Sequence, residues 1–375
     1  MPSYRKKVAH CAGDQAASGG VLPGRGRNIS HNPVHCILPP HVLNHMAKSS
    51  DENVRRVAIE TIALGEALRS MRTTLALMPF MAAIPSPQAQ KNRLVYDMKH
   101  GTAPLPGQLV RSEGQPACGD EAADEAYDYS GYTYDFYQKI FKRNSLDDNG
   151  MTLISSVHYG NDFDNAFFNG EQMCYGDGDG KLFILFTKSL DVVAHELTHG
   201  VTQFTSNLDY YGEPGALNES FSDVMGQLVT QWRLNETVDK ASWLVGHEIM
   251  GPGTKATALR TFKDEKAYEN DPLLGTDPQP KHMKDKYTGH SDNNGVHINS
   301  GIPNHAFYRI AMEIGGYAWE KAGQIWYKTL LALYRTSDFQ DAANTTYEKA
   351  ATLYGAGSME QQAVKTGWKA VGISV

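Results

Sequence analysis

The sequence has few cysteines, no long apolar run and no excess of basic residues, and each of these absences excludes a class of protein. Its four cysteines are widely spaced among 375 residues and form no CxxC pair, so they indicate neither a disulfide framework nor a cysteine-based structural zinc site. No segment reaches the roughly 20 apolar residues that cross a bilayer. The formal net charge of −7, from 42 acidic and 35 basic residues, argues against nucleic acid or an anionic membrane surface as a partner.

The N-terminal region divides into a tail and a compact segment. Residues 1–33 are rich in Gly, Ser and Asn without periodicity, which is typical of a disordered tail or a non-native extension, and no apolar segment of a secretory signal peptide is visible. From residue 34 we expect a folded segment. Ser49 and Glu52 have the spacing of a helix capping box. The residues that then recur on one helical face are Val54, Val57, Ala58, Thr61, Ile62, Gly65 and Leu68.

The pattern beyond this segment changes from strands to helices. Residues 82–91 contain two prolines and small polar residues, which indicates an exposed linker that proteases can reach. Strand-like runs follow, and helical periodicity begins at about residue 189 and continues at 216–233, 303–314 and 317–335. This order predicts an α+β protein with a β-rich lobe at 92–205, an α-helical lobe at 206–375 and a cleft between them.

An HExxH motif is the strongest chemical signal in the chain. A spacing of four residues puts His195 and His199 on one helical face, where both imidazoles reach one ion, and leaves Glu196 near its open side. A catalytic zinc needs a third protein ligand and an open position for water. Glu219, twenty residues after His199, supplies that ligand from a second helix. We therefore predict one Zn²⁺ ion held by these three residues, with Glu196 as the base that activates the water.

Two aspartates are predicted to orient the ligating histidines. Asp223 follows Glu219 by one helical turn, and Asp191 precedes His195 by one turn. A metzincin site is excluded, because Thr202 and Thr205 stand where that class requires glycine and histidine. The alternative, an exposed polar helix face without metal, requires several independent coincidences.

From about residue 94 to the C-terminus the sequence resembles the thermolysin family of metallopeptidases. Beyond HExxH, the resemblance is carried by DNAFFNG at 164–170, DYY at 209–211, ALR at 258–260 and SDNNGVHINSGIPN at 291–304. It implies a two-lobed α+β fold with the zinc site in the cleft between the lobes. It also implies that the edge strand binds substrate backbone through Asn165 and the carbonyl of Ala166.

The resemblance implies roles for four further residues. Tyr210 and His297 would donate hydrogen bonds to the oxyanion of the transition state, with Asp292 orienting His297. Arg260 would bind a substrate carbonyl and support the third zinc ligand. The positions that match the family's apolar pocket for the residue after the scissile bond, each equally readable as ordinary core, are Val192, Phe186 and Leu259.

Residues 34–91 resemble the short propeptide of the protealysin-like branch of this family, whose hallmark is a Pro-Pro pair, here Pro39-Pro40. The resemblance implies an inactive precursor whose propeptide lies in the catalytic cleft and is removed by a cut within 82–92. A stiff Pro-Pro segment is suited to lie in a cleft without being cut. Cys36 is a candidate soft ligand that blocks the zinc, and the alternative is an ordinary thiol.

Calcium is the point at which the sequence departs from the family. The positions that match the family's calcium ligands are Thr230, Ser242, Leu244, His247 and Thr257. These residues do not supply the several carboxylate oxygens that Ca²⁺ requires, so we expect calcium to be absent or weakly bound. The sequence DGDG at 177–180 lacks the rest of a calcium loop and is interpreted as a tight turn.

The residues and the resemblance together predict a zinc metalloendopeptidase that acts on proteins or peptides and prefers a hydrophobic residue after the scissile bond. Secretion is expected from the resemblance, with retention in the cytoplasm as the alternative because no signal peptide is visible. A zinc aminopeptidase would need an acidic site for a free amine, and no GAMEN-type motif is present. A purely binding or adhesive role is disfavoured, because both Glu196 and His297 are present.

Overall fold

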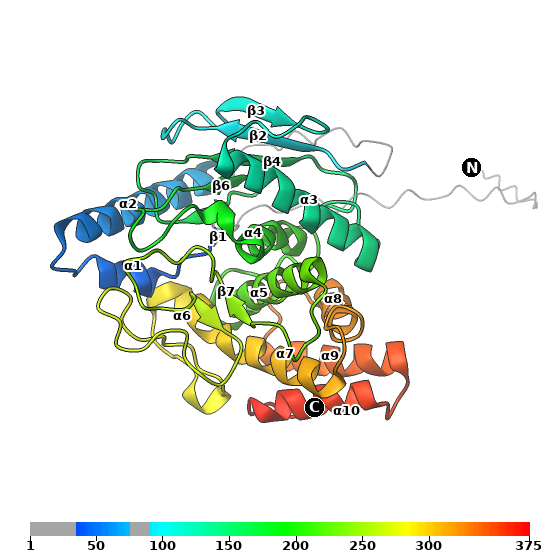
Figure 1. Cartoon of the computed structure of the whole chain (residues 1–375). Coiled ribbons are helices and arrows are strands. Elements are labelled where there is room, and N and C mark those ends of the chain that lie inside the picture. Colours follow the sequence, from blue (N-terminus) through cyan, green and yellow to red (C-terminus); the bar gives the residue numbers. More distant parts are fainter. Residues whose placement is uncertain (1–34, 76–89) are drawn as a thin grey trace, which may run out of the picture.

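The computed structural model describes residues 35–75 and 90–375 of the chain (Figure 1). The tail expected at 1–33 and nearly all of the linker expected at 82–91 lie outside these described residues. Within them, the chain forms a sheet-containing lobe and a helical lobe, and the helices α4 (Leu190–Gln203) and α5 (Gly212–Leu234) lie between the two in Figure 1. The predicted α+β class is therefore confirmed.

The main sheet has six strands in the order β1-β5-β6-β4-β2-β3. Their bounds are β1 His35–Cys36, β2 Arg93–Asp97, β3 Gln108–Ser112, β4 Leu153–Val157, β5 Ala166–Phe168 and β6 Met173–Tyr175. β4 pairs in parallel with β2 and with β6, and the remaining pairs are antiparallel. The edge strand β1 comes from the segment before the linker, so the first described residues of the chain complete the sheet of the following lobe.

A long helix that the sequence pattern did not predict packs against this sheet. Helix α3 (Glu121–Phe141) contacts β2, β3 and β4 and begins at Asp120, whose side chain accepts a hydrogen bond from the amide of Ala123. Five tyrosines in 21 residues gave it a weak helical signature, because aromatic residues lose rotamer freedom in a helix. The helix is stabilised by the packing of its buried face, which outweighs this low helix propensity.

The helical lobe follows the predicted periodicity. A two-stranded sheet of β7 (Leu244–Val245) and β8 (Arg260–Thr261) lies beside it. Its helices are α6 Ser291–Asn299, α7 Gly301–Ile314, α8 Ala322–Ala332, α9 Phe339–Tyr354 and α10 Met359–Ala370. Helix α7 packs on α10 and on α5, so the lobe is built around α5, most of which is buried.

The segment before the linker forms two helices, α1 (Pro40–Met46) and α2 (Glu52–Leu75). Helix α2 lies beside the sheet-containing lobe, and α1 lies against the helical lobe, where His41 contacts Tyr268 at 3.0 Å (Figure 1). The predicted apolar face is confirmed, because Val54, Val57 and Ala58 are at most 1% exposed. The predicted capping residue is wrong. Asp51 accepts the amide hydrogen bonds of Asn53 and Val54, and Ser49 accepts that of Asp51.

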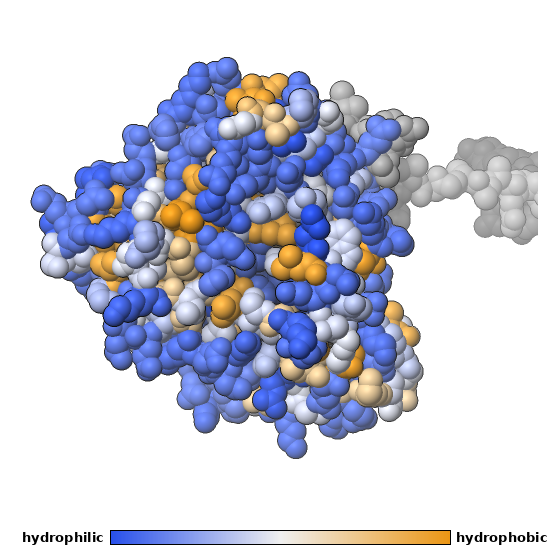
Figure 2. All heavy atoms as spheres, in the orientation of Figure 1, coloured by the Kyte–Doolittle hydropathy of each residue, from blue (hydrophilic) through white to orange (hydrophobic). Residues whose placement is uncertain are grey.

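Ion pairs attach α2 to loops of the following lobe. Arg56 forms an ion pair with Asp162 at 3.0 Å, and Asp51 forms one with Lys181. Figure 2 shows that the visible face of the molecule is mostly hydrophilic, with apolar side chains in small separate groups. No helix among the described residues is long and apolar enough to cross a membrane.

Candidate metal centre

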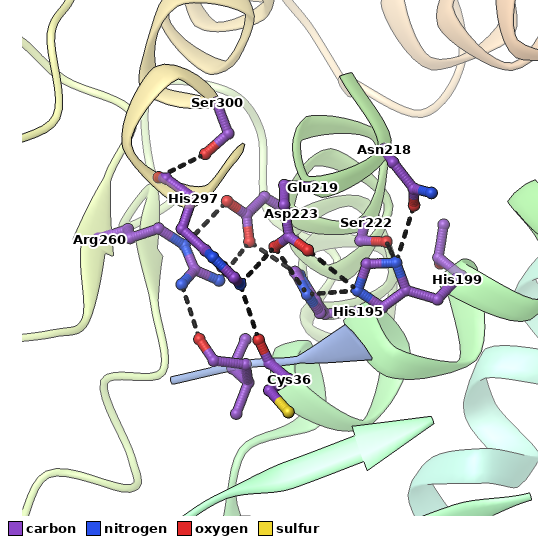
Figure 3. Close-up of polar contacts among 12 residues, drawn as sticks. Cys36, His195, His199, Asn218, Glu219, Ser222, Asp223, Arg260, His297 and Ser300 are labelled. Atoms are coloured by element: carbon purple, nitrogen blue, oxygen red, sulfur yellow. Dashed lines mark hydrogen bonds and ion pairs between the residues drawn. The ribbon is translucent and has the colours of Figure 1, made fainter. Parts of the chain in front are cut away.

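Helix α4 carries the HExxH motif through the middle of the molecule. Both His195 and His199 are fully buried, and their Nε2 atoms lie 3.1 Å apart (Figure 3). Helix α5 approaches α4 closely at Gly226, where a Cβ atom would lie 2.6 Å from the carbonyl oxygen of Asp191. Glycine at this position therefore permits the packing that brings α5 to the histidines.

Glu219 of α5 completes a cluster of three donors. Its Oε2 lies 3.5 Å from Nε2 of His195, and its Oε1 lies 3.5 Å from Nε2 of His199. Among the residues that the structure describes, these three form the one group of His, Cys, Asp or Glu side chains whose ligand atoms all lie within 4.8 Å of one another. Two imidazoles and one carboxylate are the donor set of a catalytic zinc site.

The outer nitrogens of the two histidines show why this cluster fits a cation. Nδ1 of His195 lies 2.8 Å from Oδ1 of Asp223, and Nδ1 of His199 lies 2.9 Å from Oδ1 of Asn218. Both acceptors place the proton on Nδ1, so the two Nε2 lone pairs face each other and the carboxylate of Glu219. A cation between them relieves the repulsion among these three donors.

Asp223 accepts hydrogen bonds from several buried side chains next to the two histidines. Besides the hydrogen bond with His195, its carboxylate accepts two from Arg260, at 2.9 and 2.7 Å, and one from Asn304 at 2.9 Å. Burial opposes ionisation of Asp223, but the charge of Arg260 and the hydrogen bond with His195 hold its pKa well below the usual range. A permanently ionised Asp223 fixes the orientation of His195.

Asp191 does not act on the histidines as predicted. Its Oδ2 accepts hydrogen bonds from the amide of Gly246 and the side chain of Gln227, and its Oδ1 accepts one from Ser189. Burial and the nearby carboxylate of Glu248 raise the pKa of Asp191 to about 7. This carboxylate thus ties the start of α4 to the loop around β7.

Glu196 is fully buried, and the backbone amides of Phe168 and Ile37 approach its carboxylate without forming hydrogen bonds of good geometry. Burial, and then the charge of Glu219, raise the pKa of Glu196 well above its usual value. A buried carboxylate without a hydrogen bond of good geometry is costly in a fold stabilised only by its own contacts. Beside three metal donors, such a group is suited to hold and move a proton.

Two further donors approach Glu219 from other elements. The hydroxyl of Tyr210, just before α5, donates to Oε1 of Glu219 and lies 3.0 Å from Nε2 of His297. Asp292 accepts from Nδ1 of His297 at 2.6 Å and from its amide at 2.8 Å. Burial lowers the pKa of His297, but the charges of Glu219 and Asp292 outweigh it and raise the pKa to about 9.

The turn at 292–295 lets the side chain of Asp292 form its hydrogen bonds with His297. Asp292, Asn293, Asn294 and Gly295 all have φ between 49° and 81°. Asn and Gly adopt this left-handed region more readily than other residues. The DNNG sequence therefore folds the carboxylate of Asp292 back onto His297.

The segment at 36–38 lies beside the metal donors and pairs with β5. β1 is antiparallel to β5, with Cys36 opposite Phe167. The amide of Ile37 donates to the carbonyl of Ala166 at 3.2 Å, and the amide of Leu38 donates to Oδ1 of Asn165 at 3.1 Å. The structure thus brings the two residues expected to bind peptide backbone into contact with a backbone from the same chain.

The remaining contacts of this segment are carbonyl groups. Nη1 of Arg260 donates to the carbonyl of Ile37 at 2.9 Å, and Nε2 of His297 lies 3.0 Å from the carbonyl oxygen of Cys36. Figure 3 shows this carbonyl pointing toward His297 and the sulfur of Cys36 pointing away. The thiol belongs to an apolar cluster with Phe167 and Cys174 and not to the group of metal donors, so the idea of Cys36 as a blocking ligand is wrong.

Some residues of the site were missed in the sequence. Asn218 and Ser222 both contact Nδ1 of His199, and Ser222 does so at 3.1 Å. They are four residues apart on one side of α5, and this helical spacing was the signal that could have found them. Asn304 closes the 291–304 motif and binds Asp223. Val192, Phe186 and Leu259 belong with Ile37 to one continuous buried apolar cluster.

Comparisons with known proteins identify this site. Two family models match the chain, the thermolysin metallopeptidase catalytic domain over residues 86–203 and the thermolysin metallopeptidase alpha-helical domain over residues 206–373. The chain belongs to the thermolysin family of metallopeptidases. It is a zinc metalloendopeptidase, and it is made as a precursor.

Individual relatives place the chain near the protealysin-like members. The structure of the precursor of protealysin, a metalloproteinase from Serratia proteamaculans, is 44% identical, covers 91% of this chain and 100% of its own, and superimposes with a TM-score of 0.82. An extracellular metalloprotease of Pectobacterium carotovorum is 44% identical over 92% of this chain and 99% of its own length. Protease PrtS of a Photorhabdus strain is 45% identical over 92% and 94%, respectively.

Proposed function

We propose that the mature protein cuts internal peptide bonds at one zinc ion held by His195, His199 and Glu219. The observation that carries this proposal is the convergence of these three buried donors, with the proton of each imidazole directed outward to Asp223 or Asn218. When bound, zinc polarises the scissile carbonyl and lowers the pKa of a water molecule. The other steps belong to side chains of the chain.

Glu196 is the general base. Its carboxylate has no hydrogen bond of good geometry among the described residues, interacts with the charge of the ligand Glu219 and lies near the amide of Ile37, so it stands between the metal donors and the bound backbone. The carboxylate takes the proton of the attacking water and passes it to the leaving amine. The low polarity that raises its pKa favours both transfers.

Tyr210 and His297 stabilise the charge that develops on the carbonyl oxygen. In the precursor the hydroxyl of Tyr210 donates to Glu219 and lies 3.0 Å from Nε2 of His297, so both groups stand beside the metal donors, within reach of a bound carbonyl. Asp292 keeps the proton on Nδ1 of His297 and supports the charged form of the ring. Donors held in this way act on the transition state more than on the ground state.

Substrate backbone binds by extension of the sheet. Asn165, the carbonyl of Ala166 and Arg260 already bind one backbone, that of residues 37–38. The side chain of Ile37 is fully buried in the apolar cluster that contains Val192 and Leu259, which supports a preference for a hydrophobic residue after the scissile bond. Residues 34–91 act as the inhibitory propeptide, and the processing cut falls in the linker at 82–92.

One metal ion is sufficient for this protein. The positions that match the family's calcium ligands carry Thr230, Leu244 and His247, which offer no carboxylate oxygen. We therefore propose that calcium is absent or weak. We also propose that the protein acts outside the cell, on the ground that a similar protein from Pectobacterium carotovorum is described as extracellular.

The test is cleavage of an internally quenched peptide blocked at both ends, before and after 1,10-phenanthroline and with zinc added back. Cleavage that is lost with the chelator and restored with zinc is expected. Because a blocked peptide has no free amine, the same result excludes a strict aminopeptidase. No cleavage by verified mature protein would overturn the proposal.

A further inference from the structure

We propose that residues 36–38 lie in the cleft in the direction and register of a substrate, and that the enzyme cuts its own Cys36–Ile37 peptide bond. This inference rests on the proposed function and adds to it a cleavage site inside the propeptide. It also assigns the pocket that receives the side chain before the scissile bond.

Four backbone contacts fix the register. The carbonyl oxygen of Cys36 lies 3.0 Å from Nε2 of His297, one of the two donors assigned to the transition state, and the hydroxyl of the other donor, Tyr210, lies 3.0 Å from the same nitrogen. The next residue, Ile37, donates its amide to Ala166 and accepts from Arg260 with its carbonyl. The fourth contact is the hydrogen bond from the amide of Leu38 to Asn165. Because the contacts come from three separate parts of the chain, namely α6, β8 and residues 165–166 at the start of β5, a slip by one residue would break them.

The direction of the chain is fixed by the pairing with β5. The partner of Cys36 is Phe167, that of Ile37 is the carbonyl of Ala166, and Leu38 reaches Asn165. The segment therefore runs antiparallel to β5, and Ile37, the residue after the Cys36–Ile37 bond, is the one bound by Arg260. Pro39 has no N–H, so the pairing ends there and α1 begins.

Side chains on the two sides of this bond enter different clusters. Ile37 is fully buried in the large core cluster that contains Val192 and Leu259. Cys36 lies in a second cluster, and its other buried members are Met98, Tyr159, Phe163, Phe167 and Cys174. Leu64 of α2 packs against this second cluster.

The second cluster therefore defines the pocket for the residue before the scissile bond. Its rings, Tyr159, Phe163 and Phe167, pack edge-to-face with centroids 5.1 to 6.2 Å apart. Removal of α2 with the propeptide takes away Leu64 and leaves these apolar rings to a substrate. We expect the mature enzyme to accept apolar side chains on both sides of the bond that it cuts.

The cut is a hydrolysis. Water adds to the carbonyl carbon of Cys36, Glu196 carries its proton to the nitrogen of Ile37, and the bond between these two atoms breaks. The products are a carboxylate on Cys36 and an amine on Ile37. Three of the four backbone contacts belong to Ile37 and Leu38, so the new terminus remains bound and the trimmed precursor remains inhibited.

Two experiments test this inference. In the first, a peptide of residues 31–41 with blocked ends is given to mature enzyme, and its products are identified by mass spectrometry. A single cut between Cys36 and Ile37 is expected, with the Ile37→Leu peptide cut at the same bond and the Ile37→Asp peptide cut at least tenfold more slowly. A generic quenched peptide is included in each assay.

The outcomes separate the inference from the proposed function. Cleavage of the generic peptide combined with a cut elsewhere in 31–41, or with none, would overturn the inference alone. Failure to cut either peptide would overturn both. In zinc-loaded full-length precursor, a chain that begins at Ile37 is expected, and the Glu196→Ala precursor should not produce it.

The second experiment does not depend on activity. In the full-length Glu196→Ala precursor, the amides of Ile37 and Leu38 are donors to Ala166 and Asn165, so hydrogen exchange in the peptide that covers them should be at least 100-fold slower than in an unfolded chain. Adding Ile37→Asp should abolish this protection, and adding Ile37→Val should preserve it. Fast exchange in the Glu196→Ala precursor would overturn the substrate-like register.

Discussion

Replacement of Asp223 by asparagine tests the buried hydrogen bonds and the ion pair that support the zinc ligand His195. The side chain of Asp223 accepts hydrogen bonds from His195 and Asn304 and two from Arg260, and both Asp223 and Arg260 are 1% exposed. The Asp223→Asn change keeps the shape but leaves the buried guanidinium without its counter-charge. Loss of one partner of a buried ion pair costs about 3–5 kcal/mol, so we expect a loss of that size in the free energy of unfolding.

The same change should weaken zinc binding. Nδ1 of His195 lies 2.8 Å from the Asp223 carboxylate, which orients the ring and increases the basicity of Nε2. Removal of such a partner lowers metal affinity about 10–100-fold. Both quantities are measured in the Glu196→Ala precursor to prevent self-cleavage, by guanidinium unfolding and by competition with a zinc chelator.

A matched control is Asp239→Asn, since the Asp239 side chain is 61% exposed, pairs with Lys240 at 3.7 Å and accepts a hydrogen bond from Thr237 at 2.6 Å that an asparagine oxygen can also accept. A surface change of this kind should alter the free energy of unfolding by less than about 0.5 kcal/mol. The reasoning would be refuted by an Asp223→Asn protein that unfolds like the control variant and binds zinc with unchanged affinity.

Three further predictions concern other parts of the molecule. Hydrogen bonds with Asp177 and Asp120 raise the pKa of His158 to about 9 against the cost of burial. The contribution of His158 to stability should therefore be present below the unfolded pKa of about 6.5 and be lost as the pH rises through 9. His158→Gln should make the free energy of unfolding less dependent on pH across that range. Gly226→Ala, whose Cβ would lie 2.6 Å from a backbone oxygen, should cost about 1–3 kcal/mol in urea unfolding and weaken zinc binding; an unchanged protein would contradict the close approach of α4 and α5. Transfer into calcium-free buffer that contains free zinc should leave the thermal midpoint unchanged, and a large drop would show a calcium site.

The zinc donors were predictable because their signal is local. His195 and His199 are four residues apart on one helix, and Asp223 follows Glu219 by one turn of the next helix, so helix geometry predicts each pair. The expectation that Glu219 joins the histidines came from the need of a catalytic zinc for a third protein ligand. Asp191 has the same spacing from His195, but the amide of Gly246, 55 residues away, takes one of its oxygens. Helical spacing gives no information about such a distant loop.

The errors in the fold have similar causes. Strand β1 has two residues, and its pairing with β5 joins positions more than 130 residues apart, so neither its register nor the carbonyl contact of Cys36 could be read from periodicity. The helix α3 was missed because its tyrosines hide the helical pattern. Asp51, in place of Ser49, caps α2, and boundaries of this kind are set by local hydrogen bonds.

The most direct test of the central claim is a Glu196→Ala enzyme, matured in trans by wild-type protein, with zinc content and blocked-peptide cleavage measured on the same sample. Glu196 is not among the three metal donors, and it alone is assigned the proton transfer. The account predicts zinc content equal to that of the wild type and cleavage reduced about 10²–10⁴-fold. Cleavage at nearly the wild-type rate, or loss of the zinc, would contradict it.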